Sequence, residues 1–124
     1  MGCSTPYYST VRMQMPGNYT ITTVQKTESL EACRAASKTY MNSMQQGCPT
    51  CKVESFSCGS ALGDQETALW GDATLEQYSV TSAETRMLLT GPENVTKPVC
   101  DKLASEITAK GMAASCIPPG QARK

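Results

Sequence analysis

The stretch QQGCPTCKVESFSC (residues 45–58) holds three cysteines in its last eleven residues. They admit three interpretations: a thiol–disulfide redox couple, a metal site, or parts of a disulfide framework. The stretch also marks the point where a helical pattern gives way to a strand pattern. The segments on either side of this stretch therefore allow the fold to be predicted.

A helix is predicted before the CPTC, with a strand after it. Thr27 or Ser29 can cap the start of the helix, and Gly47 can end it. Its apolar stripe, at helical spacing, comprises Leu30, Cys33, Tyr40, Met41 and Met44. The strand covers 51–58. Ahead of the helix, two alternating segments flank the turn signal PGN, so residues 7–24 are predicted to form a β-hairpin.

The C-terminal part repeats this order. A strand is predicted over 84–91, a helix over 95–111 with Pro98 in its first turn, and a short last strand within 112–119. The apolar stripe of that helix comprises Val99, Cys100, Leu103, Ala104 and Ile107. The long connection 59–82 is predicted to contain a short helix over 64–70 and an edge strand over 77–81.

These patterns predict one α+β domain. Because both halves run strand, helix, strand, they form a weak internal repeat. We expect a β-hairpin followed by two βαβ-like halves, with a mostly antiparallel sheet and two helices on one face. This topology is similar to a ferredoxin-like sandwich, although no family motif accompanies it. The expected divisions are a flexible N-terminal segment (1–6), a single domain (7–118) and a C-terminal tail (119–124).

Composition excludes several functions. Eleven Lys and Arg balance eleven Asp and Glu, which is not the electrostatic pattern of a nucleic-acid binder. No apolar run is long enough to span a bilayer. The chain has no histidine, which removes the commonest general base and metal ligand, and no catalytic constellation or cofactor is predicted. Seven cysteines without histidine favour disulfides and an oxidising compartment.

Helix geometry suggests which cysteines pair. Cys33 lies fourteen residues before Gly47, or about 21 Å at about 1.5 Å per residue. A strand returning beneath the helix covers that distance in about six residues, which reaches Cys58 once the turn is allowed for. The same reasoning brings Cys100 over Cys116. We therefore predict disulfides Cys33–Cys58 and Cys100–Cys116, each worth about 3 kcal/mol.

Cys48 and Cys51, the two cysteines of the CPTC motif, remain to be assigned. A redox role needs a low thiol pKa, but this motif follows a helix and so lies at the negative end of the helix dipole. A zinc site would need Cys48, Cys51 and Cys58 with a fourth thiolate, and a second CxxC motif is absent. A local disulfide stiffening the turn is the preferred interpretation.

The seventh cysteine, Cys3, lies in the start MGCST. This start has no charged or strongly apolar leader region, so we expect a signal peptide to have been removed. A Gly-Cys-Ser start also resembles the cleavage point of a bacterial lipoprotein, which makes Cys3 a candidate for lipid attachment. The alternatives are a free cysteine or a disulfide-linked dimer.

The middle of the chain holds the remaining candidates. Trp70 and Tyr78 are candidate binding anchors, with a core role for Trp70 as the alternative. The neighbouring carboxylates match no calcium loop and are expected to form a solvated surface. They are Asp64, Glu66, Asp72 and Glu76. Asn18 and Asn94 begin N-glycosylation triplets in predicted turns.

We therefore expect a non-catalytic, exported binding or assembly domain of the bacterial cell envelope. Its location would be periplasmic, anchored to the outer membrane or extracellular. Its partner would be another envelope protein or a cell-wall or surface component, contacted through the open sheet face or through 59–82. The alternative is a thiol–disulfide exchange protein that uses Cys48 and Cys51.

Overall fold

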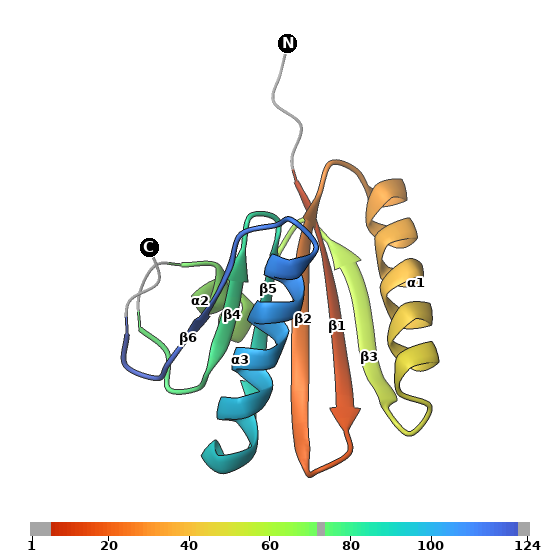
Figure 1. Cartoon of the computed structure of the whole chain (residues 1–124). Coiled ribbons are helices and arrows are strands. Elements are labelled where there is room, and N and C mark those ends of the chain that lie inside the picture. The colour runs from red at the N-terminus through yellow and green to blue at the C-terminus, as the bar shows by residue number, and fades with distance from the viewer. Residues whose placement is uncertain (1–5, 72–73, 122–124) are drawn as a thin grey trace.

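The chain folds around one six-stranded antiparallel sheet with the strand order β3-β1-β2-β5-β4-β6. The computed structural model describes residues 6–71 and 74–121 (Figure 1). The elements are β1 (Tyr7–Met15), β2 (Tyr19–Thr27), α1 (Leu30–Gly47), β3 (Lys52–Gly59), α2 (Asp64–Trp70), β4 (Ser79–Ser82), β5 (Thr85–Thr90), α3 (Glu93–Ala109) and β6 (Ala114–Ile117). The predicted α+β class, antiparallel sheet and disulfide bonding are confirmed.

The sheet is built from two equivalent halves, β1-β2-α1-β3 and β4-β5-α3-β6. In each half the last strand pairs with the first strand of the hairpin. The two halves join where β2 pairs with β5. Each half therefore has a hairpin of its own, whereas the sequence predicted one hairpin followed by two βαβ-like units. The predicted edge strand at 77–81 is also wrong, because β4 pairs with β5 on one side and with β6 on the other.

The first hairpin forms as its sequence predicts. Met15 pairs with Tyr19, and the backbone turns between them at Gly17 and Asn18, which both have positive φ. Glycine and asparagine tolerate this conformation better than other residues. Along β1 every second side chain is buried, which is the pattern of a strand with one face on the core.

The two long helices begin differently. Ser29 caps α1, since its hydroxyl accepts a hydrogen bond of 3.0 Å from the backbone N–H of Ala32. Helix α3 starts after Pro92, at Glu93, two residues earlier than predicted. Pro98 therefore lies in the second turn of α3, not in the first. There it lacks the N–H that would donate to the carbonyl of Asn94.

Two hydrophobic clusters hold the helices on the sheet. The first takes side chains from α1 and α3 together with buried strand residues, and the second takes Leu69 and Trp70 from α2. The buried members of the first cluster include Val11, Met13, Ile21, Val80, Met87 and Leu89. The buried members of the second are Val24, Leu69 and Leu88. No helix in the described part of the chain is long and apolar enough to cross a membrane.

Candidate binding groove

Three disulfides connect six cysteines. Cys33–Cys58 and Cys100–Cys116 have Cα–Cα distances of 5.9 and 5.5 Å, and each links the first half of a long helix to the last strand of its own half. The third, Cys48–Cys51, spans the turn after α1 with a Cα–Cα distance of 5.4 Å. The first two are the pairs that the helix and strand lengths predict, and the third is the local disulfide preferred for the two remaining cysteines. Cys3 lies outside the described residues.

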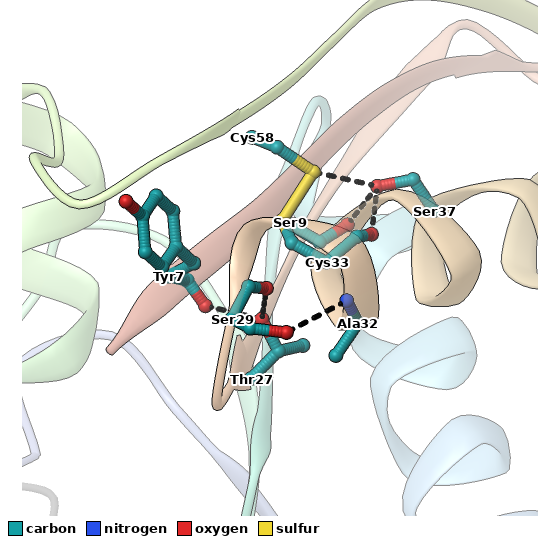
Figure 2. Close-up of a disulfide and its surroundings, with 8 residues drawn as sticks. All are labelled: Tyr7, Ser9, Thr27, Ser29, Ala32, Cys33, Ser37 and Cys58. Atoms are coloured by element: carbon teal, nitrogen blue, oxygen red, sulfur yellow. Dashed lines mark hydrogen bonds between the residues drawn. A yellow bond between two sulfur atoms is a disulfide. The ribbon is translucent and has the colours of Figure 1, made fainter. Parts of the chain in front are cut away.

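Two buried serine hydroxyls lie beside the Cys33–Cys58 disulfide (Figure 2). The hydroxyl of Ser37 donates to the carbonyl oxygen of Cys33 at 2.9 Å, and its Oγ lies 2.6 Å from the Oγ of Ser9 on β1. The Sγ of Cys58 is 3.4 Å from the Oγ of Ser37. Both serines are buried, and because the single proton of the Ser37 hydroxyl goes to the Cys33 carbonyl, the hydroxyl of Ser9 is the donor to Ser37. Sequence reasoning missed Ser37, because it searched the inner face of this helix for apolar residues only.

The Cys48–Cys51 bond lies in a tight turn at the carboxyl end of α1. The backbone N–H of Cys48 donates to the Met44 carbonyl at 2.8 Å, and that of Cys51 donates to the Cys48 carbonyl at 3.0 Å. Cys51 is only 4% exposed. The negative end of the helix dipole disfavours a thiolate here.

The alternative zinc site of Cys48, Cys51 and Cys58 is not formed, because all three sulfurs are in disulfide bonds. Cys58 is joined to Cys33, and Cys48 is joined to Cys51. In residues 6–71 and 74–121, no group of three or more Cys, Asp or Glu side chains could hold a metal ion.

A groove of about 390 Å³ runs between α1 and β3, the outermost strand on that side. Residues spaced by three or four positions along one flank of α1 form its wall. The residues that line it include Leu30, Arg34, Lys38, Met41, Phe56 and Cys58. Phe56 is 61% exposed, and the two cations lie across the groove from it. Phe56 lies two positions from Cys58 on β3 and so shares its face, but sequence reasoning did not predict its exposure.

Trp70 and Tyr78, the two predicted anchors, belong to different clusters. The Arg86 guanidinium lies 4.8 Å from the centre of the Trp70 ring, and its Nη1 donates to the carbonyls of Leu69 and Gly71 at 3.0 Å each. Trp70 also packs 5.8 Å from the ring of Tyr8. Arg86, which orders the end of α2, was not among the predicted residues.

Tyr78 is buried in the first cluster. Its hydroxyl donates to Oε2 of Glu93, at the start of α3, at 3.2 Å. Burial raises the pKa of Tyr78, and the hydrogen bond to Glu93 and the nearby negative charges raise it further. The structure therefore does not bring Tyr78 and Trp70 into one surface.

The remaining predicted polar residues are mostly exposed. Glu66 on α2 lies 3.8 Å from the Arg12 guanidinium, while Asp64 and Glu76 face solvent. The Arg12 side chain is 39% exposed and that of Glu66 is 15% exposed, and an ion pair at this long distance near the surface contributes little stability. Asp72 falls outside the described residues. Asn18 lies in the hairpin turn as predicted, whereas Asn94 lies in the first turn of α3.

Searches of protein-family models, curated proteins and solved structures found no match to this chain.

Proposed function

We propose that this protein is a non-catalytic binding or assembly domain, exported to the bacterial cell envelope, and that the groove between α1 and β3 is its contact surface. The observation that carries this proposal is the exposed Phe56 at a groove with Arg34 and Lys38 on the opposite wall. Aromatic side chains and arginine are the residue types most enriched in protein interfaces. An exposed aromatic ring gains most of its burial energy only when a partner covers it.

The disulfides support the proposed compartment. Two of them link helix to strand in equivalent places, and such bonds persist in oxidising environments. We place the protein in the periplasm, on the outer membrane or outside the cell. Lipid attachment through Cys3 would tether it there. Its partner would be an envelope protein or a cell-wall or surface component.

The finer part of the predicted fold, a ferredoxin-like sandwich with two helices on one face, is also a proposal. It is supported by the split unit β2-α1-β3, in which β1 pairs with both β2 and β3 and so lies between them. It is supported further by the shared cluster of α1 and α3.

The competing hypothesis is thiol–disulfide exchange through Cys48 and Cys51. The burial of Cys51 and the position of Cys48 at the end of α1 argue for a structural bond instead. We expect the oxidised protein to show no catalytic turnover in oxidising or reducing a model dithiol substrate. Turnover that is lost in Cys48→Ser would establish the enzyme.

Photo-crosslinking tests the proposed contact surface. A photoreactive benzoylphenylalanine replaces Phe56 in cells of the source organism, and in a matched control it replaces Met112, which is also an exposed apolar residue. We expect a discrete adduct from position 56 alone, and we expect Arg34→Glu with Lys38→Glu to abolish it. Equal adducts from both positions, or none from position 56, would contradict the proposal.

A further inference from the structure

The opposite edge of the sheet carries a second, broad and shallow groove, between α3 and β6. Its lining is mostly small side chains, with one carboxylate. The lining includes Asp101, Ala104, Ser105, Ala114, Ser115 and Cys116. It occupies the same place in the second half of the fold as the α1–β3 groove does in the first half. Each groove lies beside a helix-to-strand disulfide.

The two grooves are complementary in content. The α1–β3 groove offers a large exposed ring and two cations, Phe56 with Arg34 and Lys38. The α3–β6 groove offers space between small side chains and the anion Asp101. The ring of Phe56 from one groove can therefore pack against the small side chains of the other, while opposite charges face each other.

The two grooves also lie at the same level of the sheet. One row of directly paired residues crosses all six strands, from Phe56 through Val11, Thr23, Met87 and Val80 to Cys116. Residues directly opposite each other in an antiparallel sheet project from the same face. Phe56 and Cys116 therefore lie in register, on one face, at the two outer edges.

The directions of the edge strands permit them to pair. Five successive antiparallel pairings separate β3 from β6, so these two strands run in opposite directions. A second copy moved sideways, without being turned over, thus brings its β6 antiparallel to β3 of the first copy. The segments 55–59 of β3 and 114–117 of β6 contain no charge and no proline, two of the features that protect an edge. The two charges of β3, Lys52 and Glu54, precede this segment, where the pairing of β3 with β1 shifts its register.

We propose that the partner is a second copy of this chain. The β3 edge of one copy adds to the β6 edge of the next, Phe56 enters the α3–β6 groove beside Cys116, and Arg34 and Lys38 face Asp101. Because the two surfaces are different, the contact is head-to-tail and extends to open chains rather than stopping at a dimer. This inference rests on the proposed assembly function and names its partner.

Sedimentation velocity of the full chain over a range of concentrations tests the inference. We expect the wild type to grow from the 13.3 kDa monomer to dimers and longer species as its concentration rises. We expect Phe56→Asp and Ser105→Arg each to weaken association by about tenfold or more. Both positions are exposed, so both variants should fold. Met112→Ser, at an exposed apolar residue that lines neither groove, should associate like the wild type.

Mixing the two variants distinguishes a head-to-tail contact from a symmetric one. Phe56→Asp retains the α3–β6 groove and Ser105→Arg retains the aromatic ring, so their mixture should form a dimer and nothing larger. A symmetric contact between the two Phe56 edges would leave Ser105→Arg unaffected and would overturn the inference. A wild type that remains monomeric at every concentration would also overturn it. If position 56 then still crosslinks to a different envelope component, the proposed function stands without self-assembly.

Discussion

Replacing Cys33 and Cys58 together by alanine should lower the free energy of unfolding by about 3.5 kcal/mol, because the bond closes a long loop in the unfolded chain. The sequence separation of this pair is 25, the largest of the three disulfides. In a domain of this size we expect the melting temperature to fall by about 10 °C. Urea unfolding followed by circular dichroism measures the change. Alanine is preferred to serine so that no new polar group is placed at the fully buried position 33.

The matched control replaces Cys48 and Cys51 by alanine. Their separation is only 3 residues, and the same loop-closure argument gives a loss of about 2 kcal/mol. The Cys100–Cys116 bond, with a separation of 16, should fall between the two. Equal losses in all three variants would contradict the view that the helix-to-strand bonds are the main staples.

Leu69→Ala should cost about 3 kcal/mol, because Leu69 is fully buried between α2 and the sheet. Its neighbours Val24 and Leu88 come from β2 and β5, the two strands that join the halves. The loss would therefore weaken the centre of the sheet as well as α2. Chemical denaturation gives the size of the change, and proteolysis near residue 70 should become faster.

Leu30→Ala is the matched control for this prediction. It makes the same chemical change at the start of α1, where the side chain is 36% exposed. We expect a loss of less than about 1 kcal/mol. A loss as large as that of Leu69→Ala would mean that α2 is not anchored by the burial of Leu69.

Local patterns explain why much of the first half was predictable. The helical spacing up to Gly47 and the strand beginning near Lys52 fix how far the chain returns, and that length places Cys58 beneath Cys33. The same argument holds for Cys100 and Cys116. In both cases the disulfide joins a helix to the strand that follows it in the sequence. The lengths of the helix and the strand are therefore sufficient to predict which cysteines pair.

The unpredicted features depend on contacts between distant residues. The pairing of β4 with β6 joins two strands of four residues each, too short to carry a clear alternation. Ser37 is buried beside its hydrogen-bond partner Ser9, which is 28 positions away in the sequence. Arg86 orders the end of α2 from a different strand. Phe56 is exposed on β3, the outermost strand of the sheet, and this edge position is set by strand pairing between distant segments.

The central claim is that two equivalent halves are each held by their own helix-to-strand disulfide. Mapping of the disulfides tests it most directly: the native protein is alkylated without reductant, digested, and its cross-linked peptides are identified by mass spectrometry. We predict Cys33 linked to Cys58 and Cys100 linked to Cys116, with Cys48 closed on Cys51. A bond between the two halves, or free thiols at Cys33 and Cys58, would contradict the account.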